Sequence, residues 1–394
     1  MFSRRTDWSF EKNPLTLCLE DLKQEHIKVF DLTESNPTAA GIRYPDSVLR
    51  RTLAKKENLL YEPQPFGSLK AREAICQMYQ KQRIAVVPSQ VILTSSTSEA
   101  YSFLFRLLLD PDDAVLFPRP SYPLFDFLSQ LNDANIDRYP LNYTTRWEMD
   151  LQALQSAVTR KTKAIVLVNP NNPTGSFVTR AELAAINPLC RTSDMAIICD
   201  EVFADYGEGA LAQAVKTLIG NQDALTFVLG GLSKSLGLPQ MKLSWIVVSG
   251  PQEKVAEALK RLEIIADTYL SVNTPAQNAL PAWLLLKDKI QKDIKARVQR
   301  NQKILGEFCA KTSLKLLNSD GGWYAILQLS STINEEAWCC ALLDKQHVFV
   351  HPGYFFDLED GAHIVVSLLT PEDIFKEGVR RIASQAAGCP AGHS

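Results

Sequence analysis

The sequence lacks the cysteine patterns, long apolar runs and charge excess that mark several large classes of protein. Its eight cysteines are scattered along 394 residues with no C-x-x-C pair, which argues against a zinc site and a disulfide framework and predicts buried free thiols in a reducing compartment. No stretch reaches the roughly 18 apolar residues that a membrane-spanning helix needs. Residues 1–12 are polar and contain no signal-peptide apolar segment. We therefore expect a cytoplasmic protein with no membrane partner and no bound metal.

An excess of charge of one sign is also missing. Lys and Arg number 42 and Asp and Glu number 44, which gives a formal net charge of −2. A nucleic-acid-binding protein would show a basic patch or a high isoelectric point, so no nucleic-acid partner is expected. Hydrophobic residues make up 46% of the chain, as in an ordinary globular protein, and the length allows about two domains.

Apolar strand-like runs alternate with helical patterns between residues 90 and 250, and this alternation predicts an α/β fold with a mostly parallel sheet. Strands are expected at 91–94, 114–117, 136–141, 164–168, 195–199, 225–229 and 245–248, and helices of this large unit at 46–58, 69–84, 101–109, 151–158 and 180–189. Long helical patterns follow at 255–270 and 275–308. From residue 314 the sequence predicts a smaller α+β unit with strands at 323–329, 348–353 and 364–367, and fraying is expected from residue 386.

Hydroxyl side chains follow the first predicted strand of this sheet. Ser96, Thr97 and Ser98 stand directly before a helical pattern, where hydroxyls are good N-caps whatever else they do. The same geometry leaves free backbone N–H groups at the positive end of a helix, which is suited to a phosphate group. Further along, Tyr122 lies between two prolines, which suits either a packed loop aromatic or a rigid ring stacked on a flat ligand.

Three more strand ends carry polar residues. The run 164–168 ends in the turn Asn169–Gly175, which presents amide side chains where ligands sit in open α/β sheets. The run 195–199 ends in Asp200, which is either a helix cap or a buried acid that holds a positive charge. The run 225–229 leads through two glycines to Lys234. Without the other motifs, this residue would be predicted to be a surface lysine. Burial would instead lower its pKa, and a neutral amine can form a Schiff base.

Together these strand ends describe a site for pyridoxal phosphate. The phosphate needs a cradle, the ring needs a stacking partner, the pyridine nitrogen needs a carboxylate and the aldehyde needs a lysine. The four predicted strand ends supply the cradle, the carboxylate and the lysine, and Tyr122, after the strand at 114–117, supplies the stacking ring.

At this point the sequence resembles the class I/II aminotransferases, which are fold-type I pyridoxal-phosphate-dependent enzymes. The likeness covers nearly the whole chain. Four motifs carry it, in this order: Tyr61 with Gly67; Ser96–Ala100; Asn169–Gly175; and Asp200-Glu201 followed by Ser233-Lys234-Ser235 and Gly237-Leu238-Pro239. The resemblance implies a three-layer fold with an N-terminal arm over 1–45, a large cofactor-binding domain over 46–280 and a small domain over 281–394.

The resemblance also implies a role for each residue. Lys234 looks like the lysine that binds the cofactor aldehyde and carries the proton, and Asp200 like the partner of the pyridinium nitrogen. Tyr122 looks like the stacking aromatic, and Asn172 like a donor to the ring's phenolic oxygen and a substrate contact. Phosphate contacts would come from Ser96, Thr97, Ser98, Ser233 and Lys242. Tyr61 looks like the residue that reaches the phosphate of the second subunit, so a homodimer is expected.

The sequence departs from the family pattern at three positions. Phe203 stands where a tyrosine usually donates to the phenolic oxygen, and Lys242 stands where the phosphate-binding cation is often arginine. Val365 stands where an arginine two residues before a serine usually binds the substrate carboxylate. Asn36 is our candidate for a replacement contact, and His351, Tyr269 and Arg43 are weaker ones that are more often structural.

The expected function is transfer of an amino group from an amino acid to a 2-oxo acid. Because Val365 cannot bind a carboxylate, a pyridoxal-phosphate-dependent lyase or decarboxylase acting on an amino acid or amine remains the alternative. A regulatory protein on this fold is disfavoured, because regulators of this kind carry a basic DNA-binding domain ahead of the fold and residues 1–30 are too short for one.

Overall fold

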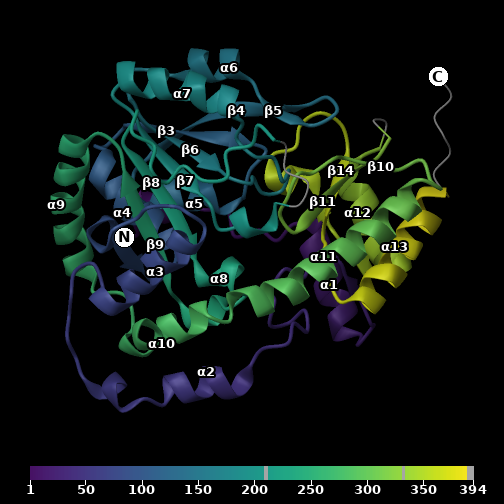
Figure 1. Cartoon of the computed structure of the whole chain (residues 1–394). Coiled ribbons are helices and arrows are strands. Elements are labelled where there is room, and N and C mark those ends of the chain that lie inside the picture. The colour runs from purple at the N-terminus through teal and green to yellow at the C-terminus, as the bar shows by residue number, and fades with distance from the viewer. Residues whose placement is uncertain (208–211, 331–332, 388–394) are drawn as a thin grey trace.

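The computed structural model describes residues 1–207, 212–330 and 333–387. An eight-stranded sheet, called the large sheet here, forms the centre of the chain (Figure 1), with strand order β2-β9-β8-β7-β6-β3-β4-β5. Its strands are β2 (Val91–Thr94), β3 (Ala114–Arg119), β4 (Asn135–Tyr143), β5 (Trp147–Met149), β6 (Thr162–Val168), β7 (Ala196–Asp200), β8 (Thr226–Gly231) and β9 (Ser244–Ser249).

The large sheet is mostly parallel, as the sequence predicts. Strands β4, β3, β6, β7 and β8 run parallel as consecutive neighbours, and β9 and the edge strand β5 are antiparallel to their partners. Because β2 is also antiparallel to β9, it runs in the same direction as β8. The carboxyl ends of β2, β8, β7 and β6 therefore meet at one edge.

Helices cover both faces of the large sheet, because residues on each strand point alternately to the two sides. Side chains such as Ile165, Ile197 and Val228 pack against one layer of helices, whereas Val166, Ile198 and Phe227 pack against the other. The first layer contains α3 (Leu69–Lys81), α6 (Leu151–Ala157), α7 (Arg180–Thr192) and α10 (Thr274–Leu284). The second contains α4 (Thr97–Leu108), α5 (Leu124–Leu131) and α9 (Gln252–Tyr269).

A second, four-stranded antiparallel sheet, called the small sheet here, has the order β10-β11-β14-β13. Its strands are β10 (Lys315–Leu316), β11 (Tyr324–Gln328), β13 (His351–Pro352) and β14 (His363–Ser367), and a separate pair joins β1 (Phe30–Asp31) to β12 (Val348–Phe349). Residues such as Leu327 and Ile364 pack on α1 (Pro14–Gln24), α12 (Glu335–Gln346) and α13 (Glu372–Ala387). On the other face, Tyr324, Ile326 and Val365 pack against Phe203 of the large-sheet unit.

Two helix predictions differ from the structure. The pattern at 275–308 forms two helices, because α10 packs on α3 and on α2 (Asp46–Leu53), whereas α11 (Lys287–Cys309) turns away to pack on α13. The pattern at 46–58 stops at Leu53, where the Asn58 side chain donates a hydrogen bond to the Leu53 carbonyl oxygen (2.8 Å). The predicted fraying beyond residue 387 lies outside the described residues.

The remaining elements are short. Helix α8 (Leu232–Ser235) follows β8, and six 3₁₀ turns are found in the described residues: η1 (Arg4–Thr6), η2 (Lys56–Leu59), η3 (Pro88–Gln90), η4 (Ala204–Tyr206), η5 (Pro239–Met241) and η6 (Gly353–Phe356). None of the described helices combines the length and apolar character required to cross a bilayer. The cysteines in the described part of the chain are free thiols.

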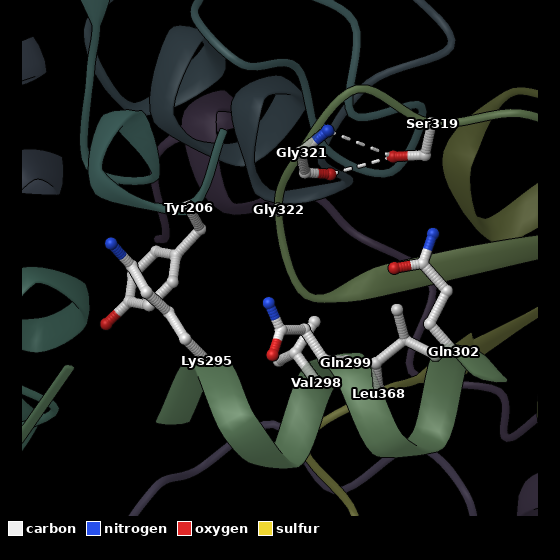
Figure 2. A pocket seen from close by; sticks show the side chains of 9 residues that line it. All are labelled: Tyr206, Lys295, Val298, Gln299, Gln302, Ser319, Gly321, Gly322 and Leu368. Carbon is white, nitrogen blue, oxygen red and sulfur yellow. Dashed lines mark hydrogen bonds between the residues drawn. The ribbon is translucent and has the colours of Figure 1, made fainter. Parts of the chain in front are cut away.

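The turn before β11 joins the two sheets. Ser319 Oγ donates to the Gly321 carbonyl oxygen (2.8 Å) and accepts from the Gly321 N–H (3.4 Å), as Figure 2 shows. A cavity of about 40 Å³ lies between this turn and α11, and the side chains of Lys295 and Gln302 of α11 line the cavity. Gly175 of the Asn169–Gly175 loop approaches the turn from the large-sheet side with φ +70°, where a Cβ atom would overlap both Ser319 Oγ and the Gly321 carbonyl oxygen.

Replacement of Gly175 by alanine should therefore destabilise the protein. Left-handed backbone and overlap with the turn together predict a loss of roughly 2–4 kcal/mol in the free energy of unfolding, measured by urea titration. Gly306→Ala is the matched control, because Gly306 lies inside α11 and a Cβ there would meet no atom of the described residues within 4 Å. This control should be neutral or stabilising, since alanine favours a helix more than glycine does. Equal effects of the two changes would contradict the prediction.

Candidate active site

The carboxyl ends of four strands bring the predicted site residues to one edge of the large sheet. Strand β2 leads to Ser96–Ser98, β6 to Asn172, β7 to Asp200 and β8 to Lys234. In open α/β sheets ligands bind at this edge. The small sheet faces the same place, because its residues Tyr324 and Val365 share an apolar cluster with Phe203.

Lys234 lies one helical turn beyond β8, and the pairing of β8 with β9 fixes its position. A Cβ on Gly230 would come within 2.5 Å of the Trp245 indole nitrogen, so a side chain there would separate the two strands. The Tyr206 hydroxyl donates to the Lys234 carbonyl oxygen (2.7 Å) and holds the backbone in place. Burial lowers the pKa of the Lys234 ammonium to about 8, against the opposing effect of the Asp200 charge. A substantial fraction is therefore neutral near physiological pH.

Asp200 is 7% exposed and ends β7 on the same side as α4. Its carboxylate accepts hydrogen bonds from the Val202 N–H (3.1 Å) and from the Tyr101 hydroxyl of α4 (3.3 Å). Burial raises its pKa to about 6, and the two hydrogen bonds and Lys234 oppose this shift. Such a carboxylate is suited to a cation, because a positive partner would restore its ionised form.

The N-terminus of α4 is arranged as an anion site. Ser96 is the N-cap residue, and its Oγ accepts a hydrogen bond from the Glu99 N–H (3.1 Å). Thr97 and Ser98 occupy the first turn, whose backbone N–H groups have no acceptor inside the helix. The Glu99 carboxylate accepts from the Ser95 N–H and from the Ser271 hydroxyl, both at 2.7 Å.

Two ring-binding candidates approach the same place from neighbouring loops. Tyr122 follows β3 and is 41% exposed, and burial together with the Asp200 charge raises the pKa of its phenol. Asn172 is buried, and its Oδ1 has no hydrogen-bond partner among the described residues. Asn171 holds the two loops together by donating to the Pro120 carbonyl oxygen (3.1 Å).

The other candidate residues differ in location and exposure. Ser233 precedes Lys234 in α8, whereas Lys242 is an exposed residue at the end of η5 with φ +47°. Tyr61 is 75% exposed and lies beside residues 266–277. Tyr269 packs on Phe103 of α4, with ring centroids 5.3 Å apart.

The positions considered for substrate contacts also differ in their exposure and surroundings. Arg43 is exposed, and Asn36 is exposed in the turn that follows β1. Val365 is 0% exposed and lies opposite His351 in the small sheet. The His351 ring lies among those of Phe349, Phe355 and Phe356, and burial lowers its pKa.

Three aromatic residues of the site were missed from the sequence. Tyr101 reaches Asp200, Tyr206 holds the Lys234 backbone, and the Trp323 ring lies 4.9 Å from Lys234 Nζ. The helical period of α4 gives Tyr101 as a core residue, and nothing local in the sequence links Trp323 to a lysine 89 positions earlier.

Residues 27–382 match the family described as aminotransferase class I and II. The chain belongs to this family. It is 30% identical over 265 residues to glutamate-pyruvate aminotransferase AlaA of Haemophilus influenzae, which covers 67% of this chain and 65% of that protein. It is 26% identical over 326 residues to tyrosine aminotransferase of Dictyostelium discoideum, which covers 79% and 77%. The matched region thus spans just under two thirds of the Haemophilus relative.

Solved structures agree on the fold. Alanine aminotransferase from Pyrococcus furiosus superposes with a TM-score of 0.88 at 25% identity, over 99% of this chain and 100% of that one. A Thermus thermophilus aspartate aminotransferase double mutant superposes with a TM-score of 0.85 at 22% identity, over 98% and 99%. The predicted fold-type I architecture is therefore confirmed. The domain boundaries stay a prediction.

Family members use pyridoxal phosphate, and the residues of this chain fit that cofactor. Within residues 1–207, 212–330 and 333–387 the buried Asn172 side chain makes no hydrogen bond, so its NH₂ group is available as a donor. Asp200 is a buried carboxylate without a cationic partner within salt-bridge distance among the described residues, and Lys234 is a partly buried amine with a lowered pKa. The first turn of α4 supplies free donors for a phosphate. The phosphate, the ring nitrogen, the phenolic oxygen and the aldehyde of the cofactor would thus each find a suitable partner here.

Replacement of Asp200 by asparagine should stabilise the cofactor-free protein while weakening cofactor binding. The pKa of Asp200 is raised from 3.8 to about 6, so burial of its charge costs roughly 2–3 kcal/mol at pH 7. Below pH 3.8 the acid is protonated in both folded and unfolded chains, and this cost disappears. The stability difference measured by urea titration should therefore grow between about pH 4 and pH 6 and then level off. A pH-independent difference would show that the charge is not responsible.

Proposed function

We propose that the protein is a pyridoxal-phosphate-dependent aminotransferase that moves an amino group from an amino acid to a 2-oxo acid. One observation carries this proposal: the sheet edge brings a buried carboxylate, Asp200, and an enclosed lysine with a lowered pKa, Lys234, to the same place. The family to which the chain belongs supports it.

Each residue would perform a definite task. Pyridoxal phosphate, when bound, supplies an electron-withdrawing ring that stabilises negative charge on the substrate carbon. Asp200 would hold a proton on the ring nitrogen, and Asn172 would donate to the phenolic oxygen. The phosphate would bind at Ser96–Ser98 and Ser233, with Lys242 adding positive charge. Lys234 would hold the aldehyde and, once released as a neutral amine, take the proton from the α-carbon of the amino acid and later return it.

The phosphate is also expected to meet a second subunit. Tyr61 is exposed, and Leu59, Leu60 and Leu270 near it are exposed as well. Such neighbouring apolar side chains favour a protein contact at this face. We therefore propose a homodimer in which Tyr61 reaches the phosphate site of its partner.

The carboxylate of the amino acid would be bound by neutral donors. Val365 is fully buried in an apolar cluster and offers no hydrogen bond. Asn36 Oδ1 accepts from the Thr38 N–H (3.1 Å) and from the Thr38 hydroxyl (2.8 Å), which leaves its NH₂ group as a donor. We propose that Asn36 and Asn172 together replace the usual arginine. A carboxylate held by neutral groups is bound less tightly than one held by a bidentate guanidinium.

Lys234→Ala tests the proposed chemistry directly. After incubation with pyridoxal phosphate and reduction with borohydride, mass spectrometry should find the cofactor attached at residue 234 in the parent protein and not in the variant. Lys161→Ala, at an exposed lysine, is the control and should keep the attachment. Normal turnover by Lys234→Ala would overturn the assignment. Product formation without a 2-oxo acid acceptor, with release of ammonia or carbon dioxide, would favour the lyase or decarboxylase instead.

Asn36→Asp tests the carboxylate contact. Aspartate keeps the oxygen that accepts from Thr38 but replaces the donor NH₂ with a second acceptor, so KM for an amino acid should rise at least about tenfold. An amine substrate without a carboxylate should show no comparable rise. Thr38→Val, which leaves the amide intact, is the control and should change KM little. If Asn36→Asp leaves KM for amino acids unchanged, another residue binds the carboxylate.

A further inference from the structure

Lys234 lies between two aromatic rings. Its Nζ atom is 4.9 Å from the centroid of the Trp323 ring and 5.2 Å from that of Phe203. The two rings meet edge to face at 5.3 Å, and Tyr206 packs against Trp323 in the same way at 5.0 Å. Phe203 and Trp323 are both buried, so these faces are shielded from water.

The electron-rich face of an aromatic ring attracts a cation, and tryptophan does so most strongly. Lys234 has no carboxylate within salt-bridge distance among the described residues, although the Asp200 charge still acts on it. Two phenols belong to the same surroundings: Tyr206 from η4, whose hydroxyl binds the Lys234 carbonyl oxygen, and Tyr324 from β11, which packs on Phe203. Among the described residues, the two ring faces are therefore the groups that lie over the ammonium.

The two rings come from different sheets. Phe203 follows β7 of the large sheet, whereas Trp323 directly precedes β11 of the small sheet. The Gly322 N–H donates to the Tyr206 carbonyl oxygen (3.0 Å), and a Cβ on Gly321 would come within 2.7 Å of that same oxygen. In Figure 2 the Gly321–Gly322 turn lies beside Tyr206. The two glycines thus allow the close contact that places Trp323 over Lys234.

We propose that Phe203 and Trp323 form an aromatic cage that stabilises the proton on Lys234 after it leaves the substrate α-carbon, with Trp323 as a positioning residue contributed by the small sheet. The inference rests on the proposed function, because it assigns a partner to the proton carrier of that reaction. The step is balanced: the C–H bond breaks, its electron pair stays with carbon, and the proton bonds to the Lys234 nitrogen lone pair.

Ring faces suit this task better than a carboxylate would. A carboxylate in contact with the ammonium would favour the protonated form strongly and hinder return of the proton. A cation–π contact is weaker, so the proton can be both accepted and released. The cage also gives a physical use to Phe203, the position at which the chain lacks the family's tyrosine hydroxyl.

Fluorinated tryptophan tests the cage without changing its shape. Fluorine withdraws electron density from the indole face, so the pKa of Lys234 should fall by roughly 0.3–1 units as fluorine atoms are added. The pKa can be read from the pH dependence of the rate at which the full-length cofactor-free chain takes up pyridoxal phosphate covalently, because the neutral amine attacks the aldehyde. The pH profile of the amino-acid half-reaction of the holoenzyme should shift in the same direction.

All six tryptophans are fluorinated together, so two variants are needed to show whether Trp323 causes the shift in the pKa of Lys234. In Trp323→Phe the pH midpoint of cofactor uptake should fall below that of the parent protein, because a weaker ring face remains, and fluorination should no longer move it. Trp338→Leu removes another buried tryptophan with an unpaired indole N–H, so it should lower stability and still respond to fluorination. A midpoint that fluorination leaves unchanged in the parent protein would overturn the cage.

Failure of the cage and failure of the proposed function have different signatures. If Lys234→Ala still binds the cofactor covalently, the proposed function is wrong. If Lys234 binds the cofactor and the pH midpoint of cofactor uptake is the same in the fluorinated and the unlabelled protein, only the cage is wrong. If the fluorinated protein does not fold, the pH midpoint of cofactor uptake is compared between Trp323→Leu and Trp323→Phe instead. Equal midpoints in these two variants would reject the cage.

Discussion

The pairing of β8 with β7 and β9 is the constraint on which the site depends. Parallel pairing with β7 places the ends of both strands at one edge, so Asp200 and Lys234 approach each other although 33 residues separate them. Antiparallel pairing with β9 requires a residue without a side chain at Gly230, opposite the Trp245 indole. Sheet register, rather than any local contact, therefore decides which charged groups meet.

Burial then changes the chemistry of both groups in a useful direction. The same desolvation raises the pKa of Asp200 to about 6 and lowers that of Lys234 to about 8. Both shifts disfavour the charged form, so these two groups destabilise the cofactor-free protein in a way that a cationic ring nitrogen and an aldehyde would relieve. Stability and cofactor binding are therefore opposed at this edge of the sheet, and the large apolar clusters on both sheet faces have to outweigh the difference.

The small sheet completes the site instead of merely covering it. One of its faces packs on α1, α12 and α13, and the other presents Tyr324 and Val365 to the large sheet. The Gly321–Gly322 turn, held against Tyr206, sets how far Trp323 reaches toward Lys234. A shift of one sheet relative to the other would alter the aromatic surroundings of the lysine and the position of the loop around Asn36 together.

The sequence by itself determined the alternation of strands and helices, the parallel sheet and the strand ends at Ser96, Asn172, Asp200 and Lys234, because these depend on local hydrophobic patterns and turn residues. It predicted one helix where α10 and α11 are separate, since the break before α11 depends on which neighbours each half packs against, and it placed the end of α2 too late. Only the tertiary structure decided that Tyr101 reaches Asp200, that Val365 is enclosed, and that Trp323 lies over Lys234. Those contacts join residues far apart in the chain, and their geometry follows from sheet register and from the packing of one sheet on the other.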